Sequence, residues 1–281
     1  MPSWAILSLG ALVVWSIQRV ISKMALATLS TPQFYLLSAI VSLPIYLPVL
    51  AFDLPPLSAV PGAIGVACLT GLTFWVTTEA IRRGPLGRVS PITGLSPALT
   101  AFLALTILGE HVGVVRTFGI VAATVAVVLL GYQRQSRPAE ASEASWEALA
   151  IASLALQGLG AFLAKVVVTP SGPSALLVST ASIQVIVGFV LLRRSGGSFP
   201  PIRTPLMQWT FVILVLAAFA TTGYLFALSA GPAAVIVPLV ATSPALGGLL
   251  GVVVLKERAT RLQYVGIALG LLGAALLALP G

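Results

Sequence analysis

The sequence predicts an all-α membrane protein with ten transmembrane helices, arranged as two inverted five-helix repeats. Three observations predict this class: the composition, a series of ten apolar runs and a duplication within the chain. Hydrophobic residues make up 58% of the 281 residues and charged residues only 8%, whereas a soluble domain carries about 25% charged residues. The mean hydropathy is +1.07. The composition therefore excludes an ordinary soluble fold.

Ten apolar runs follow one another along the chain, most of them near the length of about 20 residues that a membrane-spanning helix needs. The runs cover about 4–26, 34–52, 61–78, 89–108, 114–132, 146–168, 175–192, 207–228, 233–255 and 262–279. A long polar stretch separates the fifth run from the sixth. We therefore expect a first five-helix repeat at 1–132, a polar linker at 133–146 and a second repeat at 147–281.

The two halves are related in sequence. A shift of 147 positions aligns 84–131 with 231–278 without a gap, and 14 of the 48 positions are identical. The identities include glycines, prolines and acids at the same places: Gly84-Pro85 with Gly231-Pro232, Pro91 with Pro238, Ser96-Pro97 with Ser243-Pro244, Glu110 with Glu257, and Gly119 with Gly266. Since five spans is an odd number, the second copy must cross the membrane in the opposite sense.

Loop charge gives the expected orientation, because basic residues collect on the cytoplasmic side of a membrane. Inverted halves place Arg116 on one side and twelve basic residues on the other: Lys23, Arg82, Arg83, Arg88, Arg134, Arg137, Arg193, Arg194, Arg203, Lys256, Arg258 and Arg261. This distribution predicts that both termini lie outside and that the linker 133–146 is cytoplasmic.

The ends of each half carry paired motifs. The first span of each half contains LVVWSIQRVISK or LALQGLGAFLAK, and the last two contain SPALTAFLALTILGEHVGVVRTFG or SPALGGLLGVVVLKERATRLQYVG. Over essentially the whole chain these motifs resemble the EamA family of the drug/metabolite transporter superfamily. The resemblance implies a ten-helix permease for small metabolites, whose cavity is lined mainly by the first, third, fourth, sixth, eighth and ninth helices. Family members often have Trp-Gly in the first helix, where this chain has Trp15-Ser16, and many keep their termini in the cytoplasm.

The expected function is a secondary transporter, an exporter of a small metabolite working by alternating access in a bacterial-type inner membrane. The expected substrate is an amino acid, an aromatic compound or another carboxylate-bearing or amphipathic solute. A lipid or lipid-carrier flippase of the same fold is the alternative. The sequence does not decide whether transport is coupled to a proton or another ion. The sequence has no enzyme motif, and its single Cys68 and His111 argue against a metal site. We expect no cofactor, no catalytic residue and no nucleic-acid partner.

Polar and aromatic side chains within the spans are the candidates for substrate binding, because such groups usually face a cavity or a partner in the membrane. The candidates are Trp15, Gln18, Arg19, Lys23, Trp75, Thr78, Glu79, Gln157, Lys165, Gln184 and Tyr224. The basic members of this set favour a carboxylate-bearing or zwitterionic ligand.

Several candidates have a structural alternative. Arg19, Lys23 and Lys165 lie toward helix ends, where long basic side chains reach the interface. Trp75 is either a wall of the pocket or a packing residue. Glu79 lies four residues before Arg83, which predicts an ion pair, with proton coupling as the alternative.

The duplicated prolines predict bent helices. Proline removes a backbone hydrogen bond and kinks a membrane helix. The fourth and ninth spans are therefore expected to bend, either as a gating hinge or as a static kink. The residues concerned are Pro91, Ser96, Pro97, Pro238, Ser243 and Pro244. The acids Glu110 and Glu257, in tight connections, are expected to cap helix N-termini, with coupling as the alternative.

Overall fold

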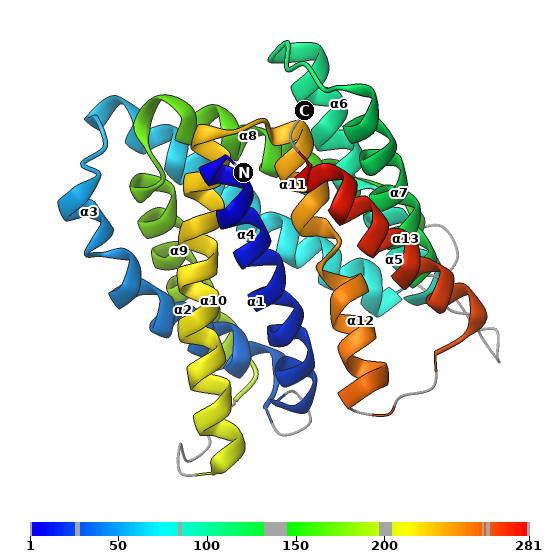
Figure 1. Ribbon diagram of the computed structural model, residues 1–281. Helices are drawn as coiled ribbons and strands as arrows, with labels where there is room; N and C mark the ends of the chain where they lie inside the picture. The colour runs from blue at the N-terminus through cyan, green and yellow to red at the C-terminus, as the bar shows by residue number, and fades with distance from the viewer. Residues whose placement is uncertain are drawn as a thin grey trace.

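The computed structural model is a bundle of helices, and it describes residues 2–25, 29–83, 86–131, 145–196, 204–254, 256 and 259–279. The described part of the chain contains no strand (Figure 1). The first half contains α1 (Ser3–Ala25), α2 (Thr31–Tyr46), α3 (Val49–Phe52), the 3-10 turn η1 (Leu57–Ala59), α4 (Val60–Arg83), α5 (Leu86–Thr93), α6 (Ser96–Ile107) and α7 (Val114–Gly131). The second contains α8 (Ser145–Ser171), α9 (Ser174–Arg194), α10 (Pro205–Ala230), α11 (Ala233–Ala241), α12 (Ser243–Val254) and α13 (Arg261–Ala278).

The expected fourth and ninth spans are each broken into two helices. α5 ends at Thr93 and α6 begins at Ser96, while α11 ends at Ala241 and α12 begins at Ser243. Proline cannot donate a backbone hydrogen bond but is tolerated in the first turn of a helix. The Ser-Pro pairs therefore start new helices at equivalent places in the two halves.

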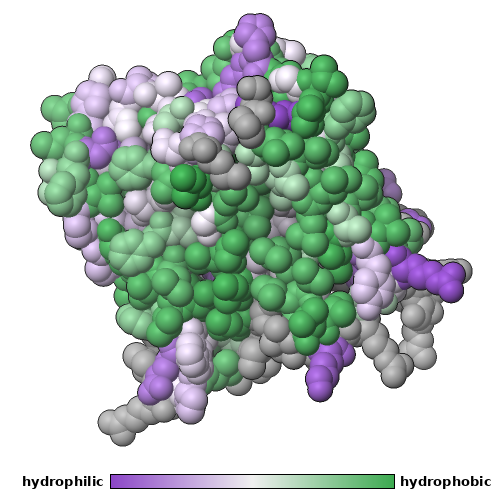
Figure 2. Space-filling model, viewed as in Figure 1, coloured by the Kyte–Doolittle hydropathy of each residue, from purple (hydrophilic) through white to green (hydrophobic). Residues whose placement is uncertain are grey.

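The outer surface of the bundle is apolar. Figure 2 shows a broad hydrophobic face with hydrophilic groups at its upper and lower edges. Large side chains on the surface include Phe102, Phe118 and Trp209, each more than 60% exposed. Such a continuous apolar surface is unstable in water and fits a lipid environment. Nine described segments are long and apolar enough to span a membrane, and α1 adds a shorter apolar segment, Ser3–Gln18. The structure thus supports nine or ten spans.

Equivalent glycines of the two halves pack reciprocally. A Cβ added to Gly119 of α7 would lie 2.8 Å from Leu277 of α13, and one added to Gly266 of α13 would lie 3.0 Å from Leu130 of α7. Small residues let membrane helices approach closely. Gly119 lies near the start of α7 and Leu277 at the end of α13, so these two helices run antiparallel. The reciprocal pattern is typical of a two-fold relationship.

The packing departs from this symmetry around α11. The pairs α1 with α10 and α4 with α8 are equivalent, and both pack closely. α11 also packs on α6 and α7 of the first half, whereas the equivalent pairs, α5 with α12 and α5 with α13, are not among the closely packed pairs of the described residues. The residues Ala233–Val240 of α11 are all buried. The two halves are thus packed together more tightly at the α11 end.

Candidate functional site

A cavity of about 380 Å³ lies inside the bundle, between helices of both halves. This volume is near the lower end of the range of about 300 to 1,000 Å³ typical of small-molecule sites. Its wall comes from α1, α2, α4, α8, α9 and α10. The polar and aromatic residues of the wall are Trp15, Gln18, Ser38, Ser42, Tyr46, Thr70, Thr180, Gln184, Thr221 and Tyr224. The arrangement suits a small solute that combines apolar surface with hydrogen-bonding groups.

Four of the candidate residues from the sequence lie on this wall: Trp15, Gln18, Gln184 and Tyr224. The candidates from the sequence did not include the serine and threonine side chains of the wall or Tyr46. One available signal was the four-residue spacing of Ser38, Ser42 and Tyr46, which places them on one face of a helix. A second signal is the internal duplication. The alignment of the two halves that pairs Lys23 with Lys165 also pairs Ser42 with Gln184, one of the candidates.

Trp15 and Tyr224 form an aromatic pair between α1 and α10. Their ring centroids are 5.3 Å apart and the rings are tilted by 57°, a favourable geometry for aromatic contact. Trp75, the other candidate tryptophan, is instead 58% exposed and does not line the cavity. The aromatic surface available to a ligand therefore involves Trp15 and not Trp75.

The equivalent place in the other half holds a polar cluster. Gln157 lies eight residues before Lys165, as Trp15 does before Lys23. Its Nε2 donates to Ser153 Oγ at 2.9 Å and approaches Thr77 Oγ1 at 3.4 Å. Gln157 thus contributes to contacts between α8 and α4 and lies outside the cavity lining. The first repeat thus has an aromatic contact at Trp15, and the second has hydrogen bonds at the equivalent residue, Gln157.

Lys165 also lies outside the cavity lining. Its Nζ donates to the backbone oxygens of Leu228 and Gly231, each at 2.8 Å. A charged donor on two carbonyls at the end of α10 satisfies groups that the helix leaves unpaired. In this structure the Lys165 ammonium therefore fixes the turn between α10 and α11.

Glu79 forms the ion pair that its spacing predicts, with Arg83 Nε 2.6 Å from Glu79 Oε1. The side chains of three further candidates, Arg19, Lys23 and Thr78, lie outside the described part of the structure, as do Glu257 and residues 132–144 of the linker region.

Two carboxylates of the first half cap helices of the second. Glu110 Oε1 and Oε2 accept hydrogen bonds from Ala233 N and Ala234 N, both at 2.8 Å, at the start of α11. Asp53 Oδ2 accepts one from Ser174 N at 3.0 Å, at the start of α9. Carboxylates at helix N-termini satisfy free N–H groups and the positive end of the helix dipole. Glu110 thus caps a helix, as expected, but the helix belongs to the other half.

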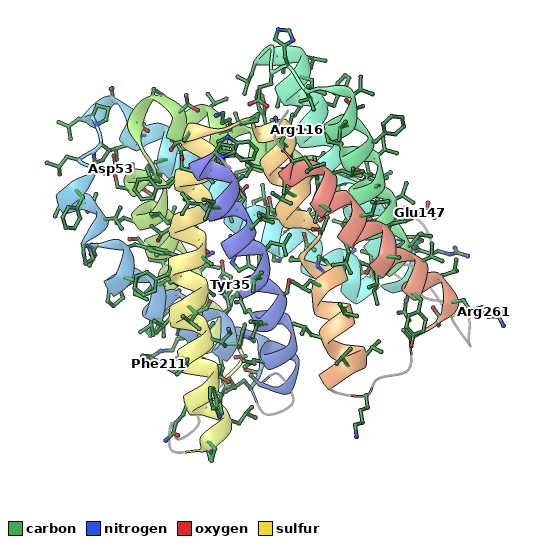
Figure 3. The ribbon with its side chains drawn as sticks, viewed as in Figure 1. Tyr35, Asp53, Arg116, Glu147, Phe211 and Arg261 are labelled. Carbon is green, nitrogen blue, oxygen red and sulfur yellow. The ribbon has the colours of Figure 1, made fainter. Side chains whose placement is uncertain are left out.

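Both chain termini lie at the end of the bundle where Glu110 and Asp53 cap helices. The Arg116 guanidinium carbon lies 5.4 Å from the centroid of the Trp4 ring, and Arg116 Nη2 donates to Leu279 O at 2.8 Å. Figure 3 shows Asp53 and Arg116 toward the upper end of the bundle, with Arg261 well below them. A buried apolar cluster that includes Leu177, Leu228 and Ile236 fills the interior near the α10 to α11 turn. We refer to this region as the sealed end.

Basic residues gather at the opposite end. Arg193 and Arg194 end α9, Arg261 begins α13, and the connection before α13 contains Lys256. All four are exposed. The described residues contain no group of three or more His, Cys, Asp or Glu side chains that could hold a metal ion.

Comparisons with known proteins agree with this architecture. A model of the EamA-like transporter family matches residues 2–132 and again 144–279. The chain belongs to the EamA-like transporter family. A solved crystal structure of a protein resembles it with a TM-score of 0.74, over 98% of this chain and 96% of that chain, at 16% sequence identity. No curated protein matches the chain in sequence.

The cavity of this EamA-like transporter differs from the expected one in its helices. The resemblance implied walls from the fourth and ninth helices, but the wall described here uses α2 and α9, the second and seventh spans, instead. α11, part of the ninth span, is buried against α6 and α7. Its side chains therefore fill the sealed end.

Proposed function

We propose that this chain is a secondary transporter that exports a small amphipathic solute, of the amino-acid or aromatic class, by alternating access. The observation that carries the proposal is the polar and aromatic cavity between the two repeats, inside a bundle with an apolar exterior. Substrate sites at a repeat interface near the membrane midplane are typical of secondary transporters.

The proposed topology has ten spans, two inverted repeats at 1–132 and 147–281, and both termini outside. The antiparallel packing of α7 and α13 through Gly119 and Gly266 supports inversion. The contacts of Arg116 with Trp4 and Leu279 support an even number of spans, because they bring the two ends of the chain together. The basic residues at the other end support a cytoplasmic location for that end.

This proposed orientation puts the sealed end outside, and we propose that the cavity then faces the cytoplasm. An exporter loads its substrate in this state. Alternating access then requires separation of α11 from α6 and α7, and closer packing of α5 with α12 at the cytoplasmic end. The breaks in the fourth and ninth spans before Pro97 and Pro244 are the proposed hinges for this exchange.

A small solute is favoured over a lipid by the size of the cavity. Its volume of about 380 Å³ is near the lower end of the range for small-molecule sites. A lipid or lipid-carrier flippase would need a lateral path from the cavity to the bilayer.

Transport by reconstituted protein tests this function. Proteoliposomes should accumulate or release a member of a panel of small amphipathic solutes faster than protein-free vesicles. Ala161 lines the cavity, whereas Leu159 on the same helix is 40% exposed. Ala161→Trp should abolish the flux by filling the cavity, and Leu159→Trp should retain it. Flux at the level of protein-free vesicles for every solute would contradict transport.

A further inference from the structure

Four hydroxyl side chains of the cavity wall lie on two helices that pack together, α2 and α10. Ser38, Ser42 and Tyr46 follow one another at four-residue spacing on α2, and Thr221 lies on α10, which packs against α2. We call these four residues the hydroxyl stripe. Their four-residue spacing puts the α2 members on one face of the helix.

The serine and threonine hydroxyls of the stripe donate their hydrogens to their own helices. Ser38 Oγ donates to Tyr35 O at 2.7 Å, and Ser42 Oγ donates to Ser38 O at 2.7 Å. Thr221 Oγ1 donates to Ala217 O at 2.9 Å. A hydroxyl has one hydrogen and two acceptor lone pairs. Once the hydrogen is used in this way, the group offers only lone pairs to the cavity.

Tyr46 extends the stripe along α2. It follows Ser42 at the same four-residue spacing and lines the cavity as a largely buried side chain. The acceptors that the stripe presents to the cavity are therefore the hydroxyl oxygens of Ser38, Ser42 and Thr221.

We propose that the hydroxyl stripe binds the hydrogen-bond-donor group of the transported solute, an amine, amide or alcohol, while Trp15 and Tyr224 contact its apolar part. This inference rests on the proposed transport function and names the substrate class of the same site. A solute bearing only acceptors, such as an isolated carboxylate, places lone pairs against lone pairs at the stripe. The stripe therefore favours N–H or O–H donors over negative charge.

Matched probes separate donor binding from apolar burial. 3-Phenylpropanol and its methyl ether share the ring, the chain and a saturated oxygen that can accept hydrogen bonds, but only the alcohol has an O–H. 3-Phenylpropylamine adds a stronger donor, and 3-phenylpropanoate is an anion with acceptors only. Binding is measured by ligand-dependent thermal stabilisation of the purified full-length chain. We expect the alcohol and the amine to bind at least about fivefold more tightly than the ether, the effect of one net hydrogen bond.

A pair of neighbouring substitutions supplies the control. Thr221 and Thr222 both donate to carbonyls one turn back on α10, at 2.9 and 3.0 Å, but only Thr221 lines the cavity. Thr221→Val keeps the shape and removes the acceptor oxygen. It should weaken binding of the alcohol and the amine about fivefold to tenfold and leave ether binding unchanged. Thr222→Val should change neither.

The outcomes distinguish this inference from the transport function. Equal affinity for the alcohol and the ether, tighter binding of the carboxylate, or an equal effect of Thr221→Val on both neutral probes would overturn the role of the stripe. Transport of an acceptor-only solute would overturn it too, while the transport function stands. Failure of every solute both to stabilise the protein and to cross proteoliposomes would contradict the transport function itself.

Discussion

The carboxylate of Glu110 accepts a hydrogen bond from the backbone N–H of Ala233 at 2.8 Å, which ties the connection after α6 to the start of α11 in the other repeat. The second carboxylate oxygen binds the next N–H group in the same way. The tie lies at the sealed end, where the two repeats pack most closely. It is therefore placed to stabilise the state in which the sealed end is closed.

Glu110→Gln should weaken this tie. An amide offers one acceptor oxygen and no charge, so one of the two hydrogen bonds and the interaction with the helix dipole are lost. We expect a loss of about 1 to 2 kcal/mol in stability, seen as a lower Tm in thermal unfolding. Glu147→Gln is the control for the helix-dipole interaction alone, because Glu147 is exposed in the first turn of α8, and it should lower the Tm less than Glu110→Gln. An equal Tm for Glu110→Gln and wild type would contradict the role of the tie.

Lys165→Met should destabilise the turn between α10 and α11 without removing a ligand contact. The substitution leaves the carbonyls of Leu228 and Gly231 without their charged donor, at a cost of about 1.5 to 3 kcal/mol. We expect a reduced Tm together with a ligand Kd within about twofold of wild type. A Kd raised more than tenfold at unchanged stability would instead assign Lys165 to substrate binding.

Substitutions of two tryptophans test whether a ligand contacts the cavity wall or the exposed outer surface. Trp15→Ala removes an aromatic wall of the cavity and the contact with Tyr224, and should weaken binding of an aromatic solute by at least about tenfold. Trp75→Ala changes a mostly exposed side chain and should leave the affinity within about twofold. Titration of both purified variants with the same solute measures the difference. The reverse order of effects would place the site at Trp75.

The proposed orientation places both termini outside. A C-terminal fusion to a reporter that is active only in the cytoplasm should therefore be inactive, and a fusion to one that is active only outside should report. Fusions within the linker 133–146 should give the opposite pattern. A cytoplasmic C-terminus would reverse the assignment of the sealed end and, with it, the proposed loading side.

The sequence predicted the helices well because charges, Gly-Pro pairs and the internal duplication mark their ends. It also predicted bends in the fourth and ninth spans, which break before Pro97 and Pro244, whereas Pro91 and Pro238 lie inside α5 and α11. It did not show which side of an apolar helix faces lipid, since lipid and a packed interior are equally apolar. For this reason the sequence alone does not distinguish a pocket wall from a surface position for Trp75.

The wall hydroxyls and the cross-repeat contacts were harder to predict. Ser42 and Thr221 are chemically the same as the serines and threonines that bond their own helices in lipid, so the cavity distinguishes them only in three dimensions. Glu110 was expected to cap a helix, but its local sequence contains no information that the helix is α11. Lys165 likewise meets carbonyls more than sixty residues away in sequence.

Access to the cavity from the two sides of the membrane tests the central claim most directly. In a Cys68→Ser background, Ala161→Cys places a single thiol on the cavity wall. Its reaction with a membrane-impermeant thiol reagent is measured in inside-out and right-side-out vesicles. Alternating access predicts labelling from both sides, faster from the cytoplasmic side, with Glu110→Gln raising the outer rate. Labelling from one side only, in both the Ala161→Cys protein and its Glu110→Gln variant, would contradict the account.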